Sequence, residues 1–476
     1  MFDAVEQIRR ECHEAIRSRC AINASASPEQ MAQVKGLHSR LSRSKRGYLK
    51  RVKALRNAVL AGHKSRIDGA RRKLKPSFDA RLMAATRATA RRKCPLSGDD
   101  LEKLANTITL DKVFGETVIV HAVPSKPGQY RPVAKSGNIR RAQQLLLRDI
   151  TLIVIGDSDC DSTVAGNGGE RQTFTDLRTH VGNGYLYWVS IDVKNFFPSL
   201  RTGHLKGFPF SQWVLEHIVF LPKETPIIFV DKKHGIKLND GAILKGEADL
   251  PEGYPLSMGD ILSLLKKVRL GLLQGDACTP QIARTFLGRE VQRVLENRDT
   301  VFGSHLDDLI LGARSQSALK ASLKALRCRL MQHPAGPLEL HDHQIVHIDD
   351  GVEFIGYHAT RCKDGRVHVR PSAKRFNRFI ERLWERWGDS LAYTKHDLRK
   401  IGIVYAKRWF SSQGAWTHKG LATLPTPFES YSWEHVRSVV ETELNRFIYA
   451  ELQDGETWWD EGDVNYDYLG EANASV

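Results

Sequence analysis

The feature that most constrains this chain is an acidic pair between two apolar runs, in VFGSHLDDLILGA at residues 301–313. The flanking runs are rich in β-branched and large apolar residues, so they predict the two short strands of a hairpin. Asp307 and Asp308 would then lie at its tip. Burying adjacent carboxylates is costly unless they hold a divalent cation such as Mg²⁺, which prefers oxygen ligands. A solvated turn is the simpler alternative, because aspartate is common in turns.

A third carboxylate occurs about 115 residues earlier, in YLYWVSIDVKNFFPSL at residues 185–200. An apolar strand ends there at Asp192, and two phenylalanines and a proline that suits a helix start follow it. If this strand lies beside the hairpin, Asp192, Asp307 and Asp308 meet at one edge of a sheet. Three carboxylates there could hold two Mg²⁺ ions about 4 Å apart, the arrangement used for in-line phosphoryl transfer. Mn²⁺ could substitute.

Two further motifs follow the first two. Each motif alone is weak evidence, but the order of all four along the chain is specific. GLLQGDACTPQIARTFL at 271–287 predicts a tight turn at Gln274-Gly275 followed by a helix, and FIGY at 354–357 predicts a later hairpin. The strand with its aspartate and two phenylalanines, the Gln-Gly turn, the His-Leu-Asp-Asp tip and the later hairpin together resemble the palm of a reverse transcriptase. The resemblance covers roughly residues 110–390. It is nearest to the bacterial group of retron, group II intron, and defence-associated or abortive-infection reverse transcriptases.

The resemblance implies an α+β fold of the right-hand polymerase type, with fingers, a palm built on an antiparallel sheet, and a thumb. We expect a basic α-helical N-terminal extension in residues 1–100, reverse-transcriptase fingers and palm in 101–357, and an α-helical thumb and C-terminal region in 358–476. The implied enzyme is a nucleotidyltransferase, an RNA-directed DNA polymerase that adds dNTPs to a DNA 3′ end.

Roles for individual residues follow from the same resemblance. Asp192, Asp307 and Asp308 would be the catalytic residues and the ligands of two Mg²⁺ ions. Phe197 would stack under the sugar of the incoming nucleotide and exclude a 2′-hydroxyl, although both phenylalanines could instead belong to the core. Further nucleotide-binding candidates are the Gln-Gly turn and three arginines of the fingers, which could also be ordinary surface cations: Gln274, Gly275, Arg131, Arg140 and Arg141.

Histidines stand at two positions where the family usually has other residues. His305 replaces the tyrosine or phenylalanine common before the acidic pair, and it could alter primer contact or simply fill space. His341 and His343 follow a strand after which the family often has a lysine that protonates pyrophosphate, and a histidine could serve as that acid. A metal site formed with His347 is an alternative that lacks supporting cysteines or carboxylates.

The positive charge is concentrated in one segment of the chain. The net charge is +16 with a sequence pI of about 9.5, and residues 35–93 hold about 20 Lys and Arg against 2 acids. Apolar residues recur there at helical spacing, so we expect helices that bind nucleic-acid phosphates; a solvated basic face is the alternative. The nucleic-acid-binding candidates are these cations and two arginines of the expected thumb helix: Lys45, Arg46, Lys50, Arg51, Arg71, Arg72, Lys73, Arg378 and Arg382.

Local patterns predict the remaining elements. These are strands at 117–123 and 131–133, a buried helix followed by a short strand at 142–155, a long loop at 156–184, a hairpin at 225–238, and helices at 317–330, from 371 and at 404–416.

Composition and short motifs exclude several classes of protein. Apolar runs are too short to cross a bilayer, and the first residues lack an apolar signal core, so we expect a cytoplasmic protein. Seven scattered cysteines without a CxxC are expected to be reduced thiols. No protease, RNase H, zinc-ribbon or endonuclease motif is visible.

The sequence leaves the biological setting open. The role that best fits the resemblance is a stand-alone bacterial enzyme that copies a structured noncoding RNA template in antiphage defence, with an accessory protein or a second copy as a further partner. One rival is a template-independent DNA polymerase, which Tyr466 or Tyr468 could prime. Another is a non-catalytic RNA-binding or intron-splicing factor. A viral-type RNA polymerase is the third, and Phe197 argues against it.

Overall fold

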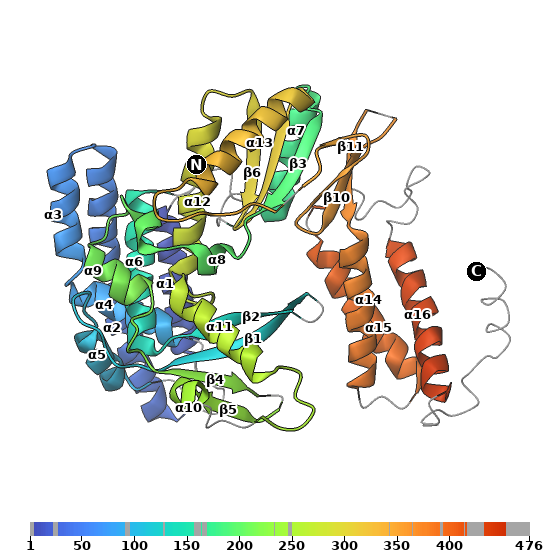
Figure 1. Ribbon diagram of the computed structural model, residues 1–476. Coiled ribbons are helices and arrows are strands. Elements are labelled where there is room, and N and C mark those ends of the chain that lie inside the picture. The colour runs from blue at the N-terminus through green and yellow to red at the C-terminus, as the bar shows by residue number, and fades with distance from the viewer. Residues whose placement is uncertain are drawn as a thin grey trace. The chain divides into compact units, whose positions relative to one another are not determined.

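The computed structural model describes residues 4–453 except 22–26, 91–95, 127–128, 157–162, 164–168, 233, 246–249, 342, 364, 391–393, 414 and 417–432. It is a mixed structure of helices and small, mainly antiparallel sheets (Figure 1). The chain forms two compact units. The first unit comprises Met1–Asn167, Ile191–Leu309 and Lys320–Asp342, and the second comprises Gly168–Ser190, Ile310–Leu319 and His343–Val476. The three segments expected from the sequence remain a prediction.

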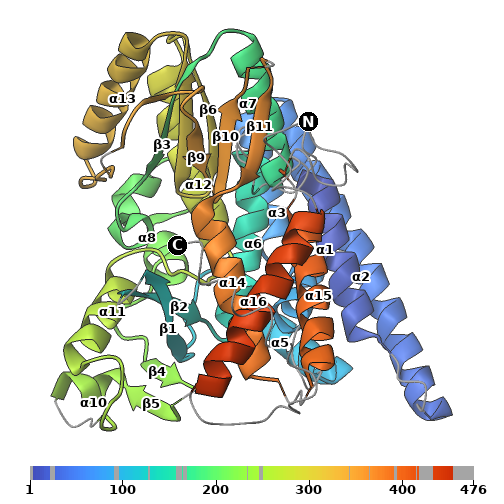
Figure 2. The same cartoon turned by 90° about the vertical axis from the view of Figure 1, so that its right-hand side faces the viewer.

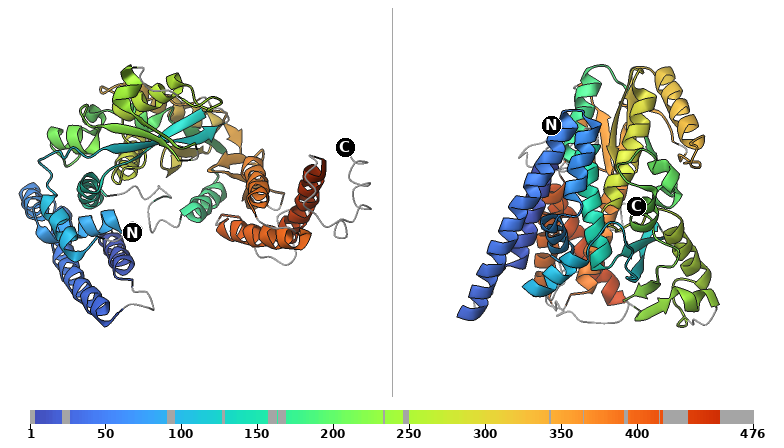
Figure 3. Two further views of the ribbon diagram at one scale, coloured as in Figure 1. Left: turned by 90° about the horizontal axis from the view of Figure 1, so that it is seen from below. Right: turned by 90° about the vertical axis from the view of Figure 1, so that its left-hand side faces the viewer.

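Before the first strand of the first unit, the described residues form five helices: α1 (Ala4–Arg19), α2 (Pro28–Leu60), α3 (Lys64–Leu74), α4 (Phe78–Thr89) and α5 (Gly98–Thr107). Ser27 and Gln30 form a capping box that begins α2. Apolar side chains at helical spacing then pack with α6 (Asn138–Val154) into one core, which includes Ile8, Leu41, Leu55, Met83, Leu146 and Ile150. The basic N-terminal helices therefore share their hydrophobic core with α6, which begins more than thirty residues after α5 ends. Figure 3 shows the ribbons of these helices from two further sides.

A four-stranded sheet of the first unit has the order β2-β1-β4-β5. Its strands are β1 (Val118–Lys126), β2 (Gln129–Lys135), β4 (Ile227–Asp231) and β5 (Ile236–Asn239). β1 pairs antiparallel with β2 and parallel with β4, while β4 and β5 form an antiparallel hairpin. Helices α10 (Asp240–Lys245) and α11 (Met258–Leu270) follow the hairpin and are drawn beside this sheet in Figure 2.

The acidic residues belong to a second four-stranded sheet, of order β6-β7-β3-β8. Its strands are β3 (Tyr187–Asp192), β6 (Thr300–His305), β7 (Asp308–Ala313) and β8 (Val346–His347). The turn between β6 and β7 contains Leu306 at a φ of 60°. Short helical segments and two longer helices lie between and after these strands: α8 (Phe196–Ser199), η1 (Thr202–Leu205), α9 (Gln212–Val214), η2 (Leu215–Val219), α12 (Thr279–Leu295) and α13 (Gln316–Met331).

The second unit contains a small sheet and a group of three helices. The sheet has the order β11-β10-β9, with β9 (Val352–Phe354), β10 (Tyr357–Arg361) and β11 (Val367–Pro371), all antiparallel. The helices are α14 (Ala373–Gly388), α15 (Lys395–Ser412) and α16 (Trp433–Gln453). Their shared core includes Phe379, Leu383, Trp387, Phe410, Val440 and Leu444.

Most of the strands and helices predicted by pattern are confirmed, including the hairpin with the acidic pair at its turn, the 225–238 hairpin and the FIGY hairpin. Two predictions are wrong. The strand expected at the end of 142–155 is absent, because α6 continues as helix to Val154. The loop expected at 156–184 contains helix α7 (Gly169–Gly182), which buries Phe174, Leu177 and Val181 along one face.

Candidate active site

Three carboxylates from distant parts of the chain share one region of the first unit. Asp192 ends β3, Asp307 lies in the turn after β6, and Asp308 begins β7, the neighbour of β3 in the sheet. Burial, and after it the charge of Asp192, raises the pKa of Asp307. Burial together with the charges of Asp307 and Asp192 raises the pKa of Asp308 to about 6. Each aspartate of the hairpin therefore senses Asp192, as like charges do at short range.

The donor set suits Mg²⁺, but the carboxylates do not form a ready-made cage. Carboxylate oxygens are preferred ligands of this ion, and a bound cation would offset the like-charge repulsion that raises these pKa values. Among the described residues, however, no group of three or more His, Cys, Asp or Glu side chains lies close enough to hold a metal ion. His341, His343 and His347 are all among the described residues, so this finding also contradicts the alternative of a metal site formed by these three histidines. A metal ion held by all three carboxylates would have to draw them closer together.

A cavity of about 550 Å³ opens beside these carboxylates, entirely within the first unit. Its lining combines three carboxylates, several cations, three aromatic rings and Gln274 of the Gln-Gly turn; it includes Arg131, Asp192, Phe196, Phe197, Lys267, Gln274, Asp307 and His341. Asp308 and Gly275 are not among the lining residues. The side chain of His341 places Nε2 3.8 Å from Asp192 Oδ1, and its backbone N–H donates to the Asp192 carbonyl at 3.1 Å.

Both phenylalanines after Asp192 line this cavity. They lie on α8, just after Asn195, and their rings meet edge to face with centroids 5.6 Å apart. Phe197 is 7% exposed and Phe196 is 2% exposed, so each ring is largely covered while part of it borders the cavity. The two expected roles, core and contact with a sugar, are thus compatible with the position of Phe197.

The Gln274-Gly275 turn packs against β2. Gly275 has a φ of 100°, and a Cβ at this position would come within 2.3 Å of the Ala134 carbonyl oxygen. Only glycine fits such an approach without displacing the backbone. The Ala134 N–H donates to the Gln274 carbonyl at 2.6 Å. The Gln274 side-chain oxygen is buried and accepts no hydrogen bond from the described residues.

Arg140 does not occupy the position expected of a triphosphate-binding residue. Its guanidinium is buried and donates to the carbonyls of His217 and Phe220, at 3.2 and 3.1 Å, and lies 3.5 Å from Asp276. It is therefore committed to internal contacts, and this is a correction to the sequence-based expectation. Arg141 is half-buried and is likewise not among the lining residues. Arg131, in contrast, is exposed, lines the cavity and lowers the pKa of Asp307.

Sequence reasoning missed the residues that hold the Gln-Gly turn in place. Asp276 is buried and accepts hydrogen bonds from Ser136 and from the side chain of Gln144. Gln144 in turn accepts from the Ala277 N–H at 3.1 Å. A signal was present, because Arg140 and Gln144 are polar residues four positions apart and therefore lie on the same face of a helix.

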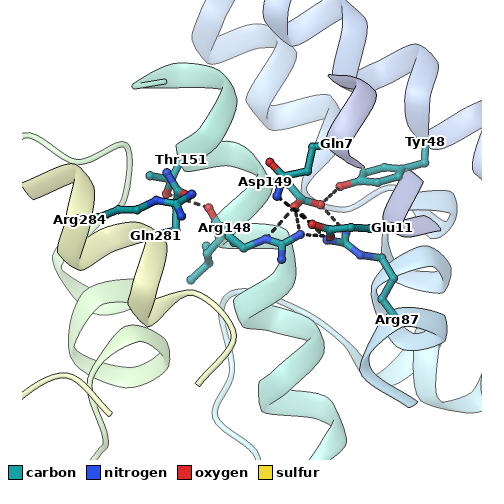
Figure 4. A network of polar contacts seen from close by, with 10 residues as sticks. Gln7, Glu11, Tyr48, Arg87, Arg148, Asp149, Thr151, Gln281 and Arg284 are labelled. Atoms are coloured by element: carbon teal, nitrogen blue, oxygen red, sulfur yellow. Dashed lines mark hydrogen bonds and ion pairs between the residues drawn. The ribbon is translucent and has the colours of Figure 1, made fainter. Parts of the chain in front are cut away.

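A second buried network joins the N-terminal helices to α6 (Figure 4). Asp149 is fully buried and accepts from Tyr48 on α2 and Arg87 on α4, each at 2.5 Å. Arg87 also pairs with Glu11 on α1 at 2.5 Å, and Arg148 adds a contact to Asp149 at 3.1 Å. Four helices therefore meet at one set of charges, which no sequence motif announced.

The predicted nucleic-acid-binding cations differ in their surroundings. Arg51 pairs with Asp79 at 3.0 Å, and Arg71 pairs with Asp68 at 3.1 Å and donates to the Pro209 carbonyl. These two are partly committed to contacts within the chain. Lys45 is half-buried, and the others are exposed: Arg46, Lys50, Arg72 and Lys73 in the first unit, Arg378 and Arg382 on α14 in the second.

Comparison with known proteins does not place the chain in a family. No protein-family model matches the chain, and no curated protein matches it significantly. Among the described residues, no helix is long and apolar enough to span a membrane. Tyr466 and Tyr468, the candidate protein primers, lie outside the described residues.

Proposed function

We propose that the protein is an RNA-directed DNA polymerase with the right-hand architecture of a reverse transcriptase, as the order of its sequence motifs implies. The observation that supports this most is that Asp192 and Asp307, separated by 115 positions in the chain, border one cavity together with Phe197 and Arg131. A polymerase needs carboxylates, an aromatic platform and a cation around one substrate-sized space. This cavity offers all three.

Several residues in or beside the cavity lining have roles in the proposed reaction. Asp192, Asp307 and Asp308 would hold two Mg²⁺ ions, which when bound lower the pKa of the primer 3′-hydroxyl and offset charge on the pyrophosphate. Arg131 would bind the phosphates of the dNTP. The ring of Phe197 would lie under the deoxyribose and leave no room for a 2′-hydroxyl. His341, beside Asp192 and in the cavity lining, is positioned to give a proton to the departing pyrophosphate.

The template in this proposal is RNA. The exposed cations of α2 and α3 would bind its phosphates without reading its sequence. A dedicated noncoding RNA and a role in antiphage defence belong to the proposal by analogy with the bacterial enzymes that the motifs resemble.

The proposal is tested by substituting Asp307→Asn in protein purified with the nucleic acid it carries from cells. We expect the variant to lose at least about 10³-fold in DNA synthesis, because the substitution removes one of the charges that a metal requires. It should melt and bind RNA as the wild type does. DNA synthesis by the variant at the wild-type rate would contradict the assignment.

Sequencing the DNA product against the copurified RNA separates the rival functions. A product complementary to the RNA supports reverse transcription. A product unrelated to any RNA would instead indicate template-independent synthesis. RNA binding without synthesis by the wild type, under any Mg²⁺ or Mn²⁺ condition, would favour the non-catalytic RNA-binding or splicing factor.

A further inference from the structure

Helix α11 forms part of the wall of the active-site cavity. It belongs to the segment 201–270, in which the sequence motifs identify no candidate site residue. Ser257 and Asp260 form a capping box at its start, and Ile261, Leu265 and other apolar residues bury one side of it in a core shared with the β1–β2 and β4–β5 strands. Five residues at helical spacing instead line the cavity: Asp260, Ser263, Leu264, Lys267 and Val268.

Lys267 is the cation that α11 places in this wall. Its side chain is half-buried, and it makes no hydrogen bond or ion pair with any of the described residues. Arg269, two positions later, shows the contrast: it donates to the Lys223 and Thr225 carbonyls, at 2.8 Å each, and pairs with Asp240 at 2.5 Å. Arg269 is thus a structural residue, whereas Lys267 lies in the cavity wall and forms no ion pair with any residue that the structure describes.

The chemistry of the cavity indicates which ligand would match that charge. A partly desolvated ammonium group is unfavourable unless an anion compensates it. Three carboxylates also line the cavity. Asp260 accepts hydrogen bonds from Ser257 at the start of α11, and the proposed function assigns the charge of Asp192 and Asp307 to metal binding. A ligand that satisfies Lys267 and Arg131 together must carry more than one negative charge. Polyphosphate meets this requirement, and lysine binds phosphate as a compact charge with three donors.

We infer that Lys267 binds the polyphosphate chain of a nucleoside triphosphate, opposite or beside Arg131 in the same cavity. This inference rests on the proposed function for the identity of the substrate, and it adds a binding residue from a helix that none of the sequence motifs includes. The neutral part of the nucleotide would then lie toward Phe197 and the side-chain oxygen of Gln274, which has no hydrogen-bond partner within the described part of the chain.

The test compares Lys267→Ala and Lys267→Arg with Lys266→Ala in the full-length protein. Lys266 is the matched control, because it precedes Lys267 on the same helix but is exposed and does not line the cavity. Binding of dTTP, dTMP and thymidine is measured by equilibrium dialysis with Mg²⁺ and without primer, so that no turnover is needed. Thermal melting checks that each variant is folded.

We expect Lys267→Ala to weaken dTTP binding about 10- to 100-fold, the effect of losing one charge-assisted hydrogen bond, and to leave thymidine binding unchanged. Lys267→Arg should retain part of the affinity, and Lys266→Ala should match the wild type.

Wild-type affinity for dTTP in Lys267→Ala would overturn the inference, as would a wild type that binds no dTTP. If the wild type synthesises DNA and Lys267→Ala has an unchanged KM for dTTP, this inference fails while the polymerase function stands. Lys267-dependent dTTP binding without any DNA synthesis would support the inference and contradict the polymerase function.

Discussion

Burial separates the roles of two arginines from the same segment. Arg131 and Arg140 are equally plausible phosphate ligands in the sequence, but Arg140 is buried against backbone carbonyls and Asp276, whereas Arg131 is exposed at the cavity. A guanidinium that already satisfies carbonyls and a carboxylate gives up those contacts only at a cost of several kcal/mol. Only Arg131 is therefore available to a ligand. Phe197 also borders this cavity, although most of its ring is covered by other residues. A ligand in the cavity could therefore contact the edge of the ring that remains accessible.

At the residue scale we predict that Phe197→Ala admits ribonucleotides. Removing the ring opens space where a 2′-hydroxyl would lie, so the preference for dNTPs over rNTPs should fall by at least about tenfold, measured as the ratio of kcat/KM values. Phe197→Tyr, which keeps the ring, is the control and should retain the preference. Unchanged discrimination in Phe197→Ala would remove the sugar-contact assignment and leave Phe197 as a core residue.

At the scale of elements, the contact between the N-terminal helices and α6 depends on charges as well as on apolar packing. Burial alone would raise the pKa of Asp149, but Arg87 and Arg148 outweigh it and the net pKa is lowered. The pKa of Glu11 is lowered in the same way, with burial opposed by Arg87 and Arg148. Removing one member of such a buried set leaves the others without a partner, which is why these pairs are costly to break.

We predict that Asp149→Asn lowers the free energy of unfolding by about 3–5 kcal/mol at pH 7, measured by urea denaturation, because Arg87 keeps its buried charge without a full counter-charge. The control is Arg40→Ala, which breaks a 2.5 Å pair with Glu102 at a partly exposed site and should change stability by no more than about 1 kcal/mol. Equal effects of the two substitutions would contradict a structural role for the buried network.

The pKa values of Asp149 and Glu11 in this network predict how the stability of the protein changes as the pH falls. Both carboxyls have a folded pKa below the ordinary values of 3.8 and 4.5, so the folded state binds fewer protons than the unfolded state. Their contribution to stability is complete above about pH 4.5 and is lost as the pH falls through the folded pKa values. Asp149→Asn should therefore lose less stability than the wild type between pH 7 and pH 3. A larger loss in the variant would reverse this assignment.

At the scale of the whole molecule, charge is distributed unevenly along the chain. The segment 35–93 accounts for the whole excess of basic over acidic residues, and among its described residues the exposed cations lie on α2 and α3. Because these helices share a core with α6, the charged surface is part of a folded unit. A surface of this kind binds polyanions mainly through release of counterions.

We predict that replacing Arg46, Lys50, Arg72 and Lys73 together by alanine weakens RNA binding and reduces its dependence on salt. For each phosphate that the variant no longer neutralises, the slope of log K against log salt concentration should fall by about 0.7 to 0.9, as measured by fluorescence anisotropy. Lys320→Ala with Lys324→Ala, two exposed cations on α13, is the control and should leave the slope unchanged. Salt-independent binding by the wild type would refute a phosphate-binding role for this surface.

The helices and strands that could be predicted from the sequence are those marked by a regular spacing of apolar side chains, because this spacing depends only on neighbouring residues. The hairpins and the long amphipathic helices follow directly from apolar spacing. Helix α7 was missed because its glycine, threonine and aspartate have low helix propensity, while only three apolar residues, Phe174, Leu177 and Val181, mark its buried face. Tertiary packing supplies the stability that propensity does not. The strand expected after α6 was wrong because a short run of β-branched residues is ambiguous between a strand and a buried helix.

The sequence by itself determined the order of the elements, the position of each aspartate at a strand end or turn, and the segment that carries the charge. These depend on neighbours a few residues apart. Only the tertiary structure decided which cations remain available to a ligand, which glycine had to pack against a backbone, and that α11 contributes a lysine to the cavity wall. Those outcomes depend on contacts between residues far apart in the chain, and no local pattern of side chains encodes burial against a distant partner.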